Sequence, residues 1–172
     1  MPSSITLDDN KKAARKMLAT YVDVGAAETA VTSATWQLVG VGVEDSSIEY
    51  NTEIEETQDI TGAVETTITS MKPTQDLAPM TVRGGSALHT KLLDILAAND
   101  TMALSQFRVM IAKSYYTENT GIYAEVHTGC TIEPLSEGGS ATVDMPIKIH
   151  FSNNKTKGTI DAIKASPTFT EA

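Results

Sequence analysis

Apolar and acidic residues alternate along residues 46–57, SSIEYNTEIEET, and this alternation limits the possible folds more than any other feature of the sequence. Successive side chains of a strand point to opposite faces, so a period of two predicts a strand with one apolar and one acidic face. The two sets are Ile48, Tyr50, Thr52 and Ile54 on one face and Glu49, Asn51, Glu53 and Glu55 on the other. Residues 64–71 alternate again after a turn at 58–63, so the two stretches are expected to be the arms of a long hairpin.

Much of the remaining chain shows patterns that are typical of strands, over the ranges 17–24, 36–43, 104–111, 122–133, 141–151 and 159–163. Within 122–133 the even-numbered residues, from Ile122 to Ile132, are expected to share an apolar face. Residues 113–121 and 153–158 are rich in polar and turn-forming side chains, and we expect them to be connections.

One helix is predicted, and it begins after Ser86, a residue type that favours the N-cap position. Its apolar side chains recur at helical spacing and form one stripe: Leu88, Leu92, Ile95 and Leu96. Asn99 and Asp100 follow its last turn. A helix with a single stripe packs on one surface, most simply a sheet face, so the chain is expected to be mainly β with one α-helix.

The charge balance argues against binding to nucleic acid. Thirteen basic and 22 acidic residues give a net charge of -9 over 172 residues, whereas proteins that hold phosphates do so with an excess of cations. The basic N-terminal run lacks the apolar stretch of a secretory signal, and no run approaches the ~18 apolar residues of a membrane span. The protein is therefore expected to be made in the cytosol, with no membrane partner.

The sequence contains none of the motifs HExxH, GxSxG, CxxC or the Walker phosphate loop, so neither an enzyme nor a cofactor is expected. His89, His127 and His150 are expected to be exposed on solvated faces. A zinc site built from His127 and His150 with Glu125 or Asp144 is the less favoured alternative. The single Cys130 cannot form an internal disulfide and is expected to be a core residue.

The order of these segments resembles the major tail proteins, or tail tube proteins, of long non-contractile-tailed bacteriophages (the siphophage type). The resemblance lies in KMLATYVDVG (16–25), WQLVGVGVEDSSIEYN (36–51), EIEETQDI (53–60), KPTQDLAP (72–79), ALHTKLLDILAAND (87–100), IKIHFSNNKTKGTID (147–161) and PTFT (167–170). It covers most of the chain from Met17, so we expect an N-terminal arm at 1–16 and one tail-tube domain at 17–172.

This resemblance implies a β-sandwich or partial barrel with a helix on its flank, which assembles into stacked hexameric rings. Long hairpins of this family join an inner β-barrel, and the candidates here are 47–71 and 122–151. The residues expected to line the lumen are Glu49, Asn51, Glu53, Glu55, Glu65, Glu125 and Asp144. An acidic wall repels DNA phosphates, so the genome would pass through the tube without binding.

The implied partners are further copies of the chain and other tail proteins, such as the tape measure and the terminator, in the tail of a virion. One alternative from another class of protein stays open at this point. The chain could be a monomeric β-sandwich binding module with calcium on its acidic strand. The candidate ligands would then be Glu53, Glu55, Glu56 and Asp59, although carboxylates two apart on a strand need further ligands from elsewhere.

Overall fold

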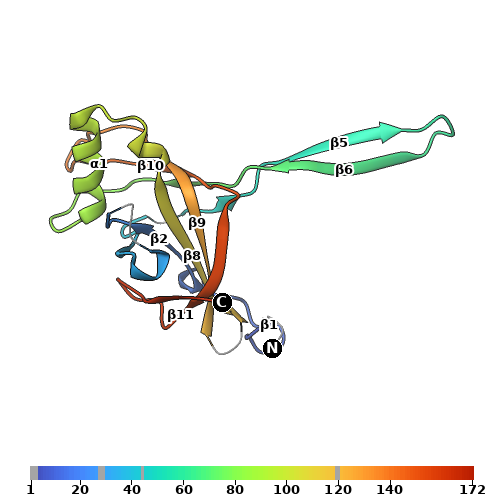
Figure 1. Ribbon diagram of the computed structural model, residues 1–172, viewed down its shortest axis with the longest axis horizontal. Helices are drawn as coiled ribbons and strands as arrows, with labels where there is room; N and C mark the ends of the chain where they lie inside the picture. The colour runs from blue at the N-terminus through green and yellow to red at the C-terminus, as the bar shows by residue number, and fades with distance from the viewer. Residues whose placement is uncertain (1–3, 27–29, 44, 119–120) are drawn as a thin grey trace.

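The computed structural model describes residues 4–26, 30–43, 45–118 and 121–172, and it shows a mainly β fold with one α-helix (Figure 1). This confirms the expected fold class, although the single chain contains no closed barrel within the described ranges. The strands are β1 (Ser4–Ile5), β2 (Leu18–Asp23), β3 (Trp36–Leu38), β4 (Ile48–Glu49), β5 (Thr52–Gln58), β6 (Val64–Met71), β7 (Thr74–Leu77), β8 (Phe107–Glu118), β9 (Gly121–Pro134), β10 (Ile147–His150), β11 (Lys155–Ile160) and β12 (Phe169–Glu171). The helix is α1 (Ala87–Ala98), and three 3-10 turns are η1 (Arg15–Met17), η2 (Val31–Ser33) and η3 (Ala103–Ser105).

Ten strands form one antiparallel sheet, whose main path runs β3-β2-β8-β9-β10-β7-β4. The long strand β9 pairs with β8 along one edge and divides its other edge between β11 and β10. The sheet curls far enough for Thr20 Oγ1 on β2 to donate to Gln75 Oε1 on β7, at 2.9 Å. The body of the protein is therefore a partial barrel that stays open between β2 and β7.

The long hairpin of the body is β8–β9, whose strands pair from residue 107 to 130, and not the hairpin expected over 122–151. Strands β9 and β10 pair over only four residues each. Strand β8 continues through 113–118, which the sequence indicated as a connection, because both β9 and β1 pair with it there. Residues 141–146, expected to be strand, form a loop, and Pro146 lacks the N–H that would extend β10.

A bulge at Gly129 changes which face of β9 is buried. The pairing shifts there by one residue, from Arg108 opposite Thr128 to Phe107 opposite Cys130, and Gly129 has a φ of 79°. Val126 before the bulge packs in one hydrophobic core, whereas Cys130 after it packs in the other. The single apolar face expected over 122–133 is therefore wrong, because one extra residue exchanges the two faces of a strand.

Helix α1 covers the core that contains Cys130, which is called the first core below, as its stripe predicted. Leu88 and Leu92 are fully buried there, and Ile95 packs at its border. Ser86 acts as the N-cap, because its Oγ accepts the His89 N–H at 3.4 Å, and Asn99 ends the helix in the left-handed conformation. No helix within the described ranges has the length and hydrophobicity that crossing a membrane requires. The arm expected at 1–16 stays a prediction; its first three residues lie outside the described ranges, and Ser4–Ile5 pairs with β8.

Candidate assembly surface

Strands β5 and β6 form a two-stranded hairpin that projects away from the body (Figure 1). They pair with each other and, within the described ranges, with no other strand. The hairpin is separated from the sheet at Asn51, which has a φ of 45° and divides the single strand expected over 46–57 into β4 and β5. Asn51 Nδ2 donates to Thr74 Oγ1 at 2.9 Å and to the Lys72 carbonyl at 3.1 Å, which fixes this bend.

The tip of the hairpin is an ordered turn held by Asp59. One oxygen of its carboxylate accepts from Thr61 N at 2.8 Å, Thr61 Oγ1 at 2.6 Å and Ala63 N at 3.0 Å. The hydrogen bond from the Thr61 hydroxyl, together with those from the backbone, lowers the pKa of Asp59 below its ordinary value. Ile60 beside it is fully exposed, so the turn holds an apolar side chain out into solvent.

One face of the hairpin is apolar and open to solvent. Ile54 and Ile68 lie directly opposite each other and remain 59% and 58% exposed, and Val64 is 60% exposed. Thr69 is an extra residue in β6, because Glu53 pairs with Ser70 while Ile54 pairs with Ile68. This bulge moves Met71 onto the apolar face, where the plain alternation of 64–71 had placed Ser70.

The opposite face is acidic and polar, and it brings together three of the expected lumen residues: Glu53, Glu55 and Glu65. Glu53 accepts from Lys72 Nζ at 2.6 Å and from Ser70 Oγ at 2.5 Å. The bond from Lys72 is the largest of the interactions that lower the pKa of Glu53. All three carboxylates are exposed, so the acidic groups of this face are open to solvent.

The other four expected lumen residues lie elsewhere. Glu49 is exposed on β4 at the base of the hairpin, and Asn51 forms the bend described above. Asp144 lies in the loop before β10, where its backbone pairs with Gly138. Glu125 lies on β9 and is only 7% exposed. The lumen assignment of all seven residues stays a prediction.

Glu125 is the centre of a buried ionic cluster that the sequence did not reveal. Its carboxylate lies 3.4 Å from Lys113 Nζ, 3.3 Å from Lys155 Nζ and 3.7 Å from His127 Nε2, and it accepts from the Tyr123 hydroxyl at 3.0 Å. Burial raises the pKa of this carboxyl, but His127 and the two lysines together lower it by more. The pKa of Glu125 therefore lies well below its ordinary value. The face of 122–133 that was expected to be solvated is buried at Tyr123, Glu125 and His127, and the His127 ring packs on Phe151 of the first core. Glu133, farther along the same strand, is exposed as expected.

The candidate metal ligands are not gathered at one place. His127 Nδ1 donates to the Ser152 carbonyl at 2.7 Å, whereas His150 Nε2 lies 3.0 Å from Glu133 on a different strand pair. Of the calcium candidates, Glu53 and Glu55 share one face of β5, Glu56 lies on the other, and Asp59 is engaged in the turn. Across the described residues, no three His, Cys, Asp or Glu side chains are grouped closely enough to hold a metal ion.

The expected exposure of the histidines is wrong for two of the three. His89 and His127 are 4% and 5% exposed, because α1 and β9 turn them toward the interior. Cys130 is fully buried in the first core, as expected, and burial raises the pKa of its thiol to about 11.

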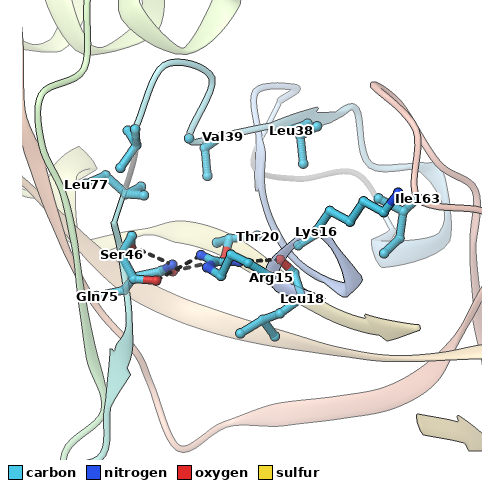
Figure 2. Close-up of a pocket in the computed structure, with 13 residues that line it drawn as sticks. Arg15, Lys16, Leu18, Thr20, Leu38, Val39, Ser46, Gln75, Leu77 and Ile163 are labelled. Carbon is cyan, nitrogen blue, oxygen red and sulfur yellow. Dashed lines mark hydrogen bonds between the residues drawn. The ribbon is translucent and has the colours of Figure 1, made fainter. Parts of the chain in front are cut away.

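A cavity of about 380 Å³ occupies the opening of the partial barrel between β2 and β7 (Figure 2). Gln75 lines this cavity and joins two of its other lining residues: its Oε1 accepts from the Thr20 hydroxyl, and its Nε2 donates to Ser46 Oγ at 3.1 Å. Arg15 Nη2 donates to the Ser46 carbonyl at 2.9 Å and closes one side. Gln75 is 1% exposed although it lies in the polar stretch TQDL, so no local pattern could have identified it as a core residue.

No protein-family model matches the sequence, and no curated protein matches it. The solved structures that are similar to this chain include the following three, each at 12% identity. The tube-terminating cap of the anti-feeding prophage has a TM-score of 0.49 and covers 89% of this chain and 95% of its own. A chain of the sheath-tube complex of PVC, an extracellular contractile injection system in its extended state, has a TM-score of 0.47 and covers 88% and 94%. A chain of the PVC sheath/tube terminator has a TM-score of 0.46 and covers 87% and 99%.

Proposed function

We propose that this protein is a structural subunit that assembles with copies of itself into a tube of the phage-tail kind, through the hairpin β5–β6. The observation that carries the proposal is that this hairpin has no strand partner and no apolar cover in the single chain, within the described residues. Its outer edges are unpaired among the described strands, and its apolar face is open to water. A two-stranded hairpin alone is marginally stable, and unpaired edges are a template for pairing with another chain.

Other copies of the chain can pair with the free strand edges of the hairpin and can cover its exposed apolar face. A neighbouring hairpin pairs with the free edge of β5 or β6, and closure of several hairpins into a ring leaves no edge exposed. The apolar side chains Ile54, Val64 and Ile68 then lie against the bodies of the subunits, and the face with Glu53, Glu55 and Glu65 turns to the lumen. We propose hexameric rings that stack, as the resemblance of the sequence to tail tube proteins implies.

The acidic face then determines how the tube treats DNA. This face carries the carboxylates of Glu53, Glu55 and Glu65, and Lys72 pairs with Glu53 at its base. Each ring presents several copies of these carboxylates, which repel phosphates over about 8 Å at physiological salt. A genome passing through the lumen therefore meets a wall to which it does not adhere. Other tail proteins, such as a tape measure and a terminator, are the further partners that this proposal implies.

Electron microscopy of the purified protein over a range of concentrations tests the assembly, and rings or tubes are the expected result. Protein that stays monomeric at every concentration would refute it. The role of the lumen is tested with tubes of the triple variant Glu53→Lys, Glu55→Lys, Glu65→Lys, and with the matched triple variant to Gln. We expect only the Lys tubes to retain short double-stranded DNA, in a salt-dependent way. Equal retention by wild-type and Lys tubes would disprove the repelling wall while leaving assembly intact.

A further inference from the structure

The tip of the hairpin β5–β6 presents an apolar side chain on a fixed turn. Ile60 is fully exposed, and the three hydrogen bonds to Asp59 hold the turn that carries it. A side chain presented in this way loses little entropy on contact, which suits it to be the anchor of an interface. The seven residues of β5 place the tip roughly 20 Å from the base of the hairpin. The hairpin points away from the body, so the tip lies far from the body of its own chain (Figure 1).

The cavity between β2 and β7 offers a surface that an apolar side chain can enter. Its apolar lining residues are Leu18, Leu38, Val39, Val43, Leu77 and Ile163. Val39 and Leu77 belong to the first core, and Figure 2 shows Leu38 and Val39 pointing into the cavity. The polar groups of Gln75 in its lining are already hydrogen-bonded to their neighbours. At about 380 Å³ the cavity has room for an isoleucine side chain, which would extend the first core there.

The charges of the hairpin tip and of the cavity are complementary. Arg15 and Lys16 line the cavity, both are exposed, and no described carboxylate lies within 4 Å of either. Arg15 donates to two backbone carbonyls, which leave its positive charge uncompensated. On the hairpin, Asp59 lies beside Ile60, and Glu56 is an exposed carboxylate on the largely apolar face. A carboxylate that is covered together with an apolar face needs a cation nearby.

We propose that the hairpin tip of one copy of this chain docks into the cavity between β2 and β7 of a second copy. Ile60 enters between Leu38 and Leu77, and the carboxylates of Asp59 and Glu56 lie toward the cations of the cavity. This inference rests on the proposed function, since it names the surface of the second copy that the hairpin contacts.

Disulfide cross-linking between two full-length variants tests the contact. Ile60→Cys protein is mixed with Leu38→Cys protein over a range of concentrations, oxidised mildly and analysed on a non-reducing gel. A disulfide requires the two Cβ atoms to lie about 4 Å apart, and the native Cys130 is fully buried and takes no part. Ile163→Cys is a second acceptor from the cavity lining, in case Leu38→Cys lowers stability. Leu135→Cys is the control, because Leu135 is 49% exposed outside the cavity.

We expect Ile60→Cys to cross-link to a cavity cysteine about tenfold faster or more than to Leu135→Cys, because docking holds the two thiols together. Equal rates with Leu135→Cys overturn the proposal, and so does a pairing of Ile60→Cys with itself at the same rate. Tubes that form without the cavity cross-link also overturn it and leave the proposed function standing. Cross-linked pairs in protein that forms no tube support the docking and refute the tube.

A charge reversal tests the ionic part of the same contact. Adding Glu56→Lys to the Ile60→Cys copy is expected to slow the cross-link about tenfold, because like charges then face each other. Lys16→Glu in the copy with the cavity cysteine is expected to restore the rate. Lys157→Glu, which reverses an exposed charge outside the cavity, is expected not to restore it. Equal rates for all of these mixtures would show that Glu56 does not face the cavity and would overturn the docking arrangement.

Discussion

Replacing both Ile54 and Ile68 with Thr tests the central claim that the hairpin assembles through its apolar face. The two side chains lie opposite each other and are 59% and 58% exposed in the single chain. Thr is also β-branched and favours strands, so the hairpin itself is expected to survive the change. The variant therefore alters the surface offered to a neighbour and leaves the body of the protein unaltered.

The expected magnitude follows from the surface that remains to be buried. Each change from Ile to Thr removes two apolar carbons, worth about 0.8 kcal/mol apiece on full burial, and about 60% of that burial would come from assembly. Adding the cost of burying a hydroxyl, we expect a loss of about 1–2 kcal/mol per side chain, or about 2–4 kcal/mol per subunit. At about 1.4 kcal/mol per tenfold change, the concentration needed for assembly rises roughly 30- to 700-fold.

Sedimentation and electron microscopy over a concentration series measure this shift, and thermal unfolding of dilute protein measures the stability of the monomer. The melting temperature is expected to stay unchanged, because the substituted side chains are exposed in the monomer. Met102→Thr is the control, since Met102 is 73% exposed outside the hairpin. Assembly of the double variant at the wild-type concentration would show that this apolar face is not the contact surface.

Three further predictions concern the body. Arg108→Met leaves the buried Asp23 carboxylate without its guanidinium partner and is expected to cost about 3–5 kcal/mol in urea unfolding, whereas Lys72→Met at an exposed ion pair is expected to leave the free energy of unfolding nearly unchanged. The pKa of Glu125 is lower in the folded than in the unfolded chain, so its contribution is complete above about pH 4.5 and is lost as the pH falls. Wild type should therefore lose more unfolding free energy than Glu125→Gln between pH 7 and pH 3, and parallel losses would contradict this. Burial raises the pKa of the Cys130 thiol to about 11, so a disulfide reagent at pH 8 should modify it only as fast as the protein unfolds.

The features that the sequence predicted correctly are those encoded locally. The capping residue Ser86 and the stripe through Leu88 and Leu92 define α1 without reference to any other segment. The hairpin is encoded in the same way, since each strand carries its own period of two around a turn. These patterns need no knowledge of what packs against them, which is why their positions agree with the structure.

The features that the sequence did not predict depend on contacts between distant segments. A single Gly129 in a strand does not reveal that the pairing shifts there, yet the shift exchanges the buried face. Glu125 was expected to be solvated because the alternation of 122–133 placed it on the polar face. Its partners Lys113 and Lys155 lie in segments that were expected to be connections, so the ionic cluster could not be foreseen. The cavity between β2 and β7 likewise requires distant segments of the chain to lie together.

The separation of the hairpin from the body has a consequence for how folding and assembly are related. Both hydrophobic cores lie in the body, and no residue of β5 or β6 belongs to either. The free energy that folds the subunit therefore comes from the body, and the apolar face of the hairpin remains available for a neighbour. A change at Arg108 should lower the melting temperature of the monomer, whereas a change at Ile54 and Ile68 should raise the concentration needed for assembly. If either change moved both quantities equally, the hairpin would be part of the folding unit, and the argument for an assembly element would fail.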